Sequence, residues 1–120
     1  MSTKEKVSVL QQLASNSVVL FGQLVNKPIT AEGPQGLYNQ EITLMINDNR
    51  PNSIIYAYLN KQAADIIHYN YQEGMYLGLR GYLQSHNGTN AVIVSSFSCF
   101  NAEGERMNIY YDEEEVAVIN

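Results

Sequence analysis

The 120-residue chain contains no tryptophan, one cysteine, two histidines and only seven lysine and arginine residues. The single cysteine, Cys99, excludes an internal disulfide and any metal site built from several thiolates. His68 and His86 stand apart in the sequence, so we assign no metal and no other cofactor. The chain also lacks a nucleophile elbow, a glycine-rich phosphate loop with its lysine, and paired histidine and carboxylate residues at metal spacing. We therefore expect a binding protein and not an enzyme.

Long hydrophobic runs are absent as well. No apolar stretch approaches the roughly 18 residues that cross a membrane, and the first residues show no signal-peptide pattern. These observations predict a cytoplasmic protein without a membrane partner. The length of 120 residues fits one domain with a single core.

Positive charge is scarce, and the formal net charge of −5 is unevenly distributed. Residues 102–120 hold six acids and one arginine, whereas residues 16–101 hold four bases and five acids, so that the body of the chain is nearly neutral. We divide the chain into an N-terminal arm (1–15), a folded domain (16–101) and an acidic C-terminal tail (102–120). The arm combines helical and strand spacings, which leaves two interpretations open: a frayed end, or a segment exchanged with a neighbouring subunit.

Tyrosine, in contrast, is abundant, with nine residues. Side chains on a strand alternate between its two faces, so residues 53–59 place Tyr56 and Tyr58 together on one face. Residues 75–83 repeat the alternation and place Tyr76, Arg80 and Tyr82 on a common face. Two predicted strands therefore each carry tyrosines on one side.

A helix is predicted between these two strands, over residues 61–72. Its apolar residues recur at the spacing of one helical face, Asn60 precedes it as a candidate N-cap, and Gly74 follows it as a candidate terminator. The apolar stripe consists of Ala63, Ile66, Ile67 and Tyr71.

Three further strands complete the predicted order. Residues 16–26 are rich in valine and leucine and contain Gly22 where a small barrel needs a bulge or bend. Residues 37–47 alternate, and Asn87-Gly88 is a strong hairpin signal that makes residues 91–100 the partner of the preceding strand. Three strands, a helix and two strands is the order of the OB-fold, an all-β, five-stranded Greek-key barrel with one helix between strands three and four.

Three stretches resemble the bacterial single-stranded DNA-binding proteins. Residues 16–24, NSVVLFGQL, followed by Pro28, are similar to the Asn-Lys-Val-x-Leu-x-Gly-x-Leu opening of that family and its later proline. Residues 56–61, YAYLNK, followed by two alanines, resemble its third strand and the start of its helix. Gly74 and residues 79–83, LRGYL, resemble its fourth strand.

The resemblance covers roughly residues 16–100 and implies sequence-independent binding of single-stranded DNA in replication, recombination or repair. It also implies a homotetramer in the cytoplasm of a bacterial host cell. The chain lacks the stacking tryptophans and the long linker of that family, so tyrosines would replace the tryptophans. The compact chain looks like a phage or mobile-element version.

Single-stranded nucleic acids bind to aromatic platforms flanked by cations, and stacking contributes about 1–3 kcal/mol per base. We expect Tyr56, Tyr58, Tyr76 and Tyr82 to form the platform together with Arg80, and Lys27, Arg50 and Lys61 to contact the backbone. Each tyrosine taken singly fits the edge of a small β core equally well. The alternatives to DNA binding are a protein-interaction or oligosaccharide-binding module on the same fold and an RNA-binding module.

Two expectations concern association. The apolar run at residues 18–21 offers more hydrophobic surface than one face of a small barrel hides, which favours symmetric association. The acidic run at residues 112–115 has three interpretations: it competes with DNA for cations, it recruits replication or recombination proteins, or it is a solvated end.

Overall fold

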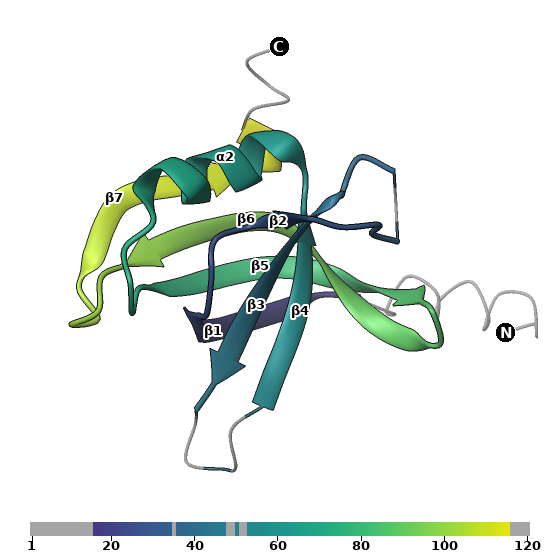
Figure 1. Ribbon diagram of the computed structural model, residues 1–120, viewed down its shortest axis with the longest axis horizontal. Helices are drawn as coiled ribbons and strands as arrows, with labels where there is room; N and C mark the ends of the chain where they lie inside the picture. Colours follow the sequence, from purple (N-terminus) through teal and green to yellow (C-terminus); the bar gives the residue numbers. More distant parts are fainter. Residues whose placement is uncertain (1–15, 35, 48–49, 51–52, 116–120) are drawn as a thin grey trace, which may run out of the picture.

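The structure is a computed structural model, and it describes residues 16–34, 36–47, 50 and 53–115. The arm predicted at residues 1–15 lies outside the described residues, as do residues 116–120 of the predicted tail. The described elements are, in chain order, β1 (Val18–Leu24), β2 (Ile29–Thr30), β3 (Gln40–Ile46), β4 (Ser53–Leu59), α2 (Lys61–Asn70), β5 (Tyr76–His86), β6 (Thr89–Phe100) and β7 (Arg106–Asp112) (Figure 1).

Five of these strands close into a barrel. Neighbours pair in the order β1, β5, β6, β4 and β3, and β3 pairs with β1 to complete the ring. All of these pairings are antiparallel except that between β4 and β6, where Ala57 lies opposite Val92 and Tyr58 opposite Ile93. The predicted OB-fold is confirmed, with β1, β3, β4, β5 and β6 as its five strands and α2 between the third and fourth. The short β2 and the strand β7 are additions to it.

The helix forms where its sequence signals predicted it. Asn60 is the N-cap, and its side-chain Oδ1 accepts a hydrogen bond from the Ala63 backbone N–H at 2.8 Å. Ala63, Ala64 and Ile67 form the buried face of the helix. The helix ends at Asn70, earlier than predicted, and Gly74 adopts a φ of +84° in the turn that follows rather than at the helix end itself.

One tight turn and one glycine within a strand shape the barrel. Asn87 and Gly88 both have positive φ, 52° and 80°, which confirms the tight hairpin between β5 and β6. Gly22 lies in β1 directly before Gln23, which pairs with both β5 and β3. A Cβ at this glycine would lie 2.7 Å from Ile46 Cδ1 and 3.0 Å from the Met45 carbonyl oxygen, so the close approach of the two strands requires the absence of a side chain.

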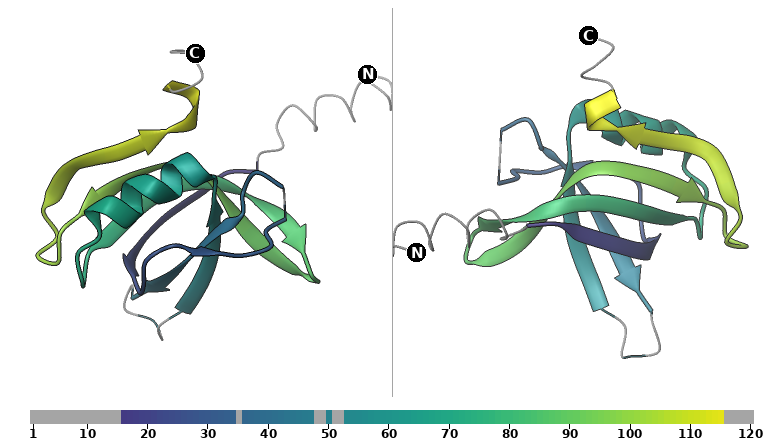
Figure 2. Two further views of the ribbon diagram at one scale, coloured as in Figure 1. Left: turned by 45° about the horizontal axis from the view of Figure 1, so that its top comes forward. Right: turned by 180° about the vertical axis from the view of Figure 1, so that it is seen from behind.

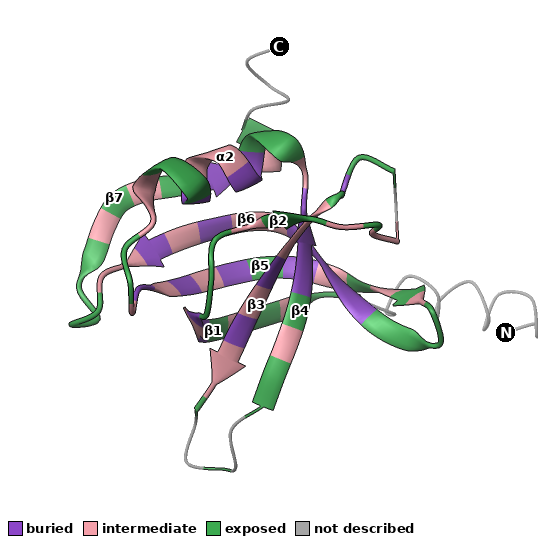
Figure 3. Ribbon diagram, in the orientation of Figure 1, coloured by how far each residue is buried: buried purple, intermediate pink, exposed green. Residues whose placement is uncertain are grey.

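The core lies inside the barrel and beneath the helix, and buried residues recur along the barrel strands and α2 (Figure 3). Figures 1 and 2 show α2 and β7 side by side over one end of the β5 and β6 sheet, while the β5–β6 hairpin projects from the other end. A second, smaller cluster of buried residues lies outside the main core and contains Tyr38, Tyr58, Ala91 and Ile93. We call this set, together with the partly buried Tyr82, the tyrosine cluster.

Strand β7 corrects the boundary predicted for the acidic tail. Residues 106–112 were assigned to that tail but pair with β6, and Tyr111 is buried with its ring stacked on Phe97 at 5.8 Å between centroids. The Tyr111 hydroxyl accepts a hydrogen bond from Asn60 Nδ2 at 2.8 Å, which ties β7 to the helix N-cap. The charge count did not reveal β7, because the acidic residues lie at its two ends. The residues between them alternate between half-buried and exposed, as on a strand at the edge of a sheet.

Within the described part of the chain, no helix has the length and apolar character needed to cross a membrane.

If β7 belongs to the fold, Tyr111→Ala lowers the free energy of unfolding by about 3–5 kcal/mol, the usual loss for truncating a large buried aromatic side chain. Denaturant unfolding measures this loss. The matched control is Tyr69→Ala, which removes the same side chain from an exposed position on α2 and is expected to change stability by no more than about 0.5 kcal/mol. Equal stability of the two variants would show that residues 106–112 do not contribute to the fold.

Candidate nucleic-acid interface

A groove of about 390 Å³ lies between the outer face of β4 and the end of the β5–β6 hairpin. Tyr56 projects into it with 54% of its surface exposed, next to the exposed Ile54. The hairpin supplies the opposite wall with Leu83 and His86. This groove, which we call the β4 groove, therefore presents flat and apolar side chains from two elements. Its lining consists of Ile54, Ile55, Tyr56, Tyr58, Leu83, His86, Thr89, Asn90, Ala91 and Val92.

Tyr58 shares the outer face of β4 with Tyr56, as predicted, but only 8% of it is exposed. The loop between β2 and β3 covers its ring: a Cβ on Gly33 would lie 3.1 Å from Tyr58 Cδ1. One edge of the ring meets His86 in a T-shaped contact with 5.7 Å between centroids. Tyr58 thus borders the groove without presenting an open ring face to it.

Two carboxylates bind the hydroxyl groups of the tyrosine cluster. Tyr58 donates to Glu41 Oε2 at 3.0 Å, and Tyr38 donates to Glu113 Oε1 at 2.5 Å. Burial raises the pKa of both phenols, and the hydrogen bonds to the carboxylates raise each pKa further. Both effects favour the neutral phenol, because ionisation would place a second negative charge beside a carboxylate.

Tyr76 and Arg80 lie elsewhere, on the outer face of the sheet formed by β1, β5, β6 and β7. The Tyr76 ring stacks on Phe21 at 5.5 Å between centroids, and Phe21 meets Phe100 edge to face at 5.2 Å. A depression of about 490 Å³ on this face is lined by Val19, Leu20, Phe21, Gly78, Leu79, Arg80, Ser96, Phe97, Ser98, Phe100, Tyr110, Tyr111 and Asp112. We call this surface the aromatic sheet face.

The structure separates Tyr82 from Tyr76 and Arg80, which were expected on a common face of their strand. The register between β5 and β6 shifts between Arg80 and Gly81, because Ser95 is an extra residue on β6. Beyond this bulge Tyr82 packs against the tyrosine cluster, whereas Tyr76 and Arg80 stay on the aromatic sheet face. A bulge bends and twists a strand, so alternation counted across it does not identify neighbours.

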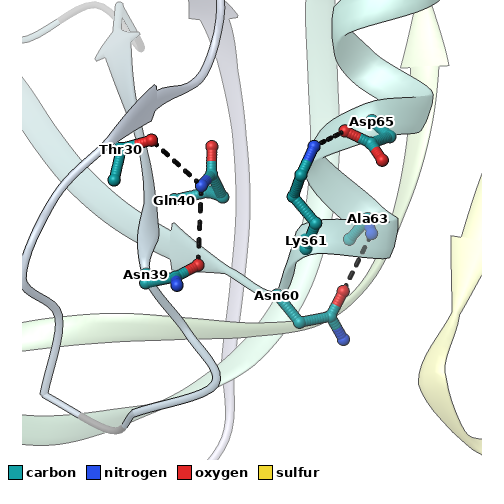
Figure 4. A network of polar contacts seen from close by, with 7 residues as sticks. All are labelled: Thr30, Asn39, Gln40, Asn60, Lys61, Ala63 and Asp65. Atoms are coloured by element: carbon teal, nitrogen blue, oxygen red, sulfur yellow. Dashed lines mark hydrogen bonds and ion pairs between the residues drawn. The ribbon is translucent and has the colours of Figure 1, made fainter.

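The remaining predicted cations are dispersed. Lys61 begins α2 and pairs with Asp65 on the same helix, near the hydrogen-bonded Gln40 of β3 (Figure 4). Lys27 lies over the ring of Tyr71 at 5.8 Å from its centroid, close to the end of α2. Arg50 belongs to the loop between β3 and β4, at the end of β4 that carries Ile54. None of the described residues that line the β4 groove is lysine or arginine.

The structure thus brings Tyr56, Tyr58 and Tyr82 together near the β4 groove and separates Tyr76, Arg80, Lys27 and Lys61 from it. Ile54, Leu83 and His86 line the groove, and Tyr38 belongs to the cluster, although the sequence did not predict these positions. The Asn87-Gly88 signal predicted the hairpin that carries His86, but the parallel pairing that sets β4 beside β6 has no local signal in the sequence.

The described residues contain no group of three or more histidine, cysteine, aspartate or glutamate side chains placed to hold a metal ion. Cys99 is fully buried, and burial raises the pKa of its thiol to about 11. The thiol therefore stays protonated near neutral pH and is a packing residue of the core.

The strand order and the position of the helix define the fold as an OB-fold, whose members include proteins that bind oligonucleotides or oligosaccharides on the second and third barrel strands and the adjacent loops. Neither a protein-family model nor a curated protein sequence matches the chain. Among solved structures, 104 chains are similar to it, as expected of a fold that hosts many functions. One is the dimeric structure of the N-terminal domain of PriB protein from Thermoanaerobacter tencongensis. It has a TM-score of 0.56 and 16% sequence identity, and the match covers 72% of this chain and 97% of that one.

The raised pKa of Tyr38 predicts a loss of stability at alkaline pH. The native state holds the phenol proton to higher pH than the unfolded chain does, so this stabilisation is complete below about pH 10 and is lost as pH rises through the native pKa. Thermal unfolding of the parent between pH 9 and pH 11 is therefore expected to show a falling midpoint. Tyr38→Phe removes the phenol and is expected to make the fall shallower.

The control for this experiment is Tyr69→Phe, which removes the hydroxyl of an exposed tyrosine on α2 and is expected to keep the slope of the parent. A Tyr38→Phe variant whose midpoint falls as steeply as that of the parent would contradict the assigned burial and carboxylate contact.

Proposed function

We propose that this chain binds single-stranded DNA without sequence preference, as a binding protein and not an enzyme, and that bases stack in the β4 groove on Tyr56. The observation that carries the proposal is the half-exposed Tyr56 ring beside Ile54, opposite Leu83 and His86 of the hairpin. The volume of the β4 groove, about 390 Å³, is within the range of small-molecule binding sites, about 300–1,000 Å³.

The position of the groove supports this assignment. It lies on β4, the third strand of the barrel, and is bordered by the hairpin between the fourth and fifth strands, which are the elements that bind oligonucleotides in other OB-folds. A duplex keeps its bases stacked inside and cannot place one on Tyr56, so a stacking groove selects single strands. From the resemblance to the bacterial family we also propose a role in replication, recombination or repair in a bacterial cytoplasm, on a phage or mobile element.

The charges indicate how the strand is held. Since lysine and arginine are absent from the described lining of the groove, base stacking contributes more to affinity here than neutralisation of phosphates. Arg50, in the loop at the Ile54 end of β4, is the predicted cation best placed to contact the backbone. Lys27, Lys61 and Arg80 contribute only if the strand continues beyond the groove.

RNA binding is the alternative. A site that binds RNA must accommodate the 2′-hydroxyl of the ribose, which DNA lacks. Titration of tyrosine fluorescence with poly-dT, poly-rU and duplex DNA separates the possibilities. We expect quenching by poly-dT, weaker quenching by poly-rU and none by the duplex. Equal quenching by single strands and duplex would exclude stacking as the mode of binding.

Stacking on Tyr56 makes a prediction about its ring and its hydroxyl. Tyr56→Ala is expected to lose about 1–3 kcal/mol of poly-dT binding, whereas Tyr56→Phe keeps the ring and binds nearly as well as the parent. Tyr69→Ala is the control, because it removes an exposed tyrosine ring from α2, where it lines a different recess. Parent-like affinity of a folded Tyr56→Ala variant would exclude Tyr56 as the platform.

We also propose that the aromatic sheet face joins copies of this chain in a homo-oligomer. Val19 and Phe21 are 71% and 52% exposed on it, and an apolar surface of this kind is usually covered by a partner. Among the described residues, positions 18–21 of β1 pair only with β5, so the other edge of this strand segment is open to a second copy. The PriB domain of similar fold is dimeric, and the resemblance to the bacterial family favours a tetramer here.

Light scattering tests the oligomer. The parent is expected at a multiple of the chain mass of 13.5 kDa at micromolar concentration. Phe21→Lys buries a charge in the proposed interface and is expected to shift the mass to that of a smaller species. Ile29→Lys places the same charge at a side chain of equal exposure, 52%, on β2 and is expected to leave the mass unchanged. A parent that runs as a monomer would exclude the interface.

A further inference from the structure

The loop between β2 and β3 closes one side of the tyrosine cluster. Its described residues, 31–34 and 36–38, form what we call the lid. The lid backbone lies directly on Tyr58, since a Cβ on Gly33 would meet the Tyr58 ring at 3.1 Å and the Tyr38 carbonyl oxygen at 2.0 Å. Tyr38, at the end of the lid, is itself buried in the cluster. Without the lid, the ring of Tyr58 would extend the surface presented by Tyr56.

Hydrogen bonds with residues distant in the chain hold the described part of the lid to the rest of the molecule. Gln84 of β5 donates to the Pro34 carbonyl oxygen at 3.3 Å, and Tyr38 donates to Glu113 at 2.5 Å. The second contact joins residues 75 positions apart and involves a charged acceptor, which makes it the stronger of the two. Glu113 is itself well placed, because it follows β7 two residues after the buried Tyr111.

We propose that Glu113 is a latch that keeps the lid closed over Tyr58, and that its release opens a larger tyrosine platform continuous with the β4 groove. This inference rests on the proposed binding of single-stranded DNA and assigns a regulation to the same groove. In the closed state only Tyr56 of the two β4 tyrosines is available to a base. In the open state Tyr58 joins it, at two residues' distance along the strand, about 6.5–7 Å.

The location of Glu113 indicates what would release the latch. It stands in the acidic run at residues 112–115, so a basic surface that pairs with this run competes with Tyr38 for the carboxylate. The acidic end would then act on DNA binding through the lid and not only by repelling phosphates. Opening of the lid and reduced repulsion of phosphates can be distinguished, because different substitutions cause them.

Tyr38→Phe breaks the latch without changing any charge, and Glu113→Ala breaks it from the other side. Each is expected to bind poly-dT about 3–10-fold more tightly than the parent, because binding improves in proportion to the fraction of molecules in the competent state. A tenfold gain corresponds to about 1.4 kcal/mol. Since both changes remove the same bond, the double variant Tyr38→Phe/Glu113→Ala is expected to gain no more than the better single variant, apart from the effect of the lost charge.

Glu114→Ala is the matched control, because it removes one negative charge from the neighbouring residue, whose carboxylate is not the one that binds Tyr38. It measures the purely electrostatic part of the gain. If Tyr38→Phe binds like the parent, and Glu113→Ala gains no more than Glu114→Ala, the latch is refuted and charge alone explains the effect.

A second readout needs no DNA. Nitration of Tyr58 by tetranitromethane, followed by peptide mass spectrometry, reports whether the ring is accessible. It is expected to increase in Tyr38→Phe and Glu113→Ala relative to the parent and to Glu114→Ala. If the parent fails to bind poly-dT, the proposed function falls, and Tyr58 nitration still decides the latch: unchanged nitration in folded variants would overturn it.

Discussion

Closure of the barrel between β4 and β6 is the constraint on which the other features depend. The two strands meet in parallel over only two residue pairs, Ala57 with Val92 and Tyr58 with Ile93, while every other junction of the ring is antiparallel. This junction sets the end of the β5–β6 hairpin opposite the outer face of β4. The β4 groove exists because this junction holds β4 and the β5–β6 hairpin, about thirty residues apart in sequence, next to each other.

The same closure divides the aromatic side chains between two surfaces of different character. On the aromatic sheet face the rings contact one another, since Phe21 stacks on Tyr76 and meets Phe100 edge to face. Near the β4 groove, the exposed ring of Tyr56 is accompanied by histidine, asparagine and threonine from the hairpin. One abundant residue type thus serves both surfaces, according to what surrounds each ring.

The acidic end of the chain is more closely integrated than its composition indicates. Strand β7 contributes Tyr111 to the core, and the Tyr111 hydroxyl accepts a hydrogen bond from Asn60, the N-cap of α2. Glu113, which follows β7, accepts a hydrogen bond from Tyr38. Two carboxylates, Glu41 and Glu113, therefore lie on the hydroxyl groups of the tyrosine cluster. Their negative charge disfavours phosphate groups at this point, so a strand bound in the groove would direct its bases toward the rings and its backbone outward.

Local patterns in the sequence determined the elements of this protein: the alternation of β4, the Asn60 cap with the apolar stripe of α2, and the Asn87-Gly88 turn each follow from interactions between residues close in the chain. Their order was sufficient to predict the OB-fold. The tertiary structure alone decided which tyrosines are open. Tyr58 is covered because Gly33 lies against it. The β6 bulge bends the sheet between Arg80 and Gly81, which separates Tyr82 from Tyr76. Residues 106–112 pair with β6, and Tyr111 stacks on Phe97. Each of these outcomes depends on a contact between distant residues, and burial is a property of such contacts and not of the side chain that is buried.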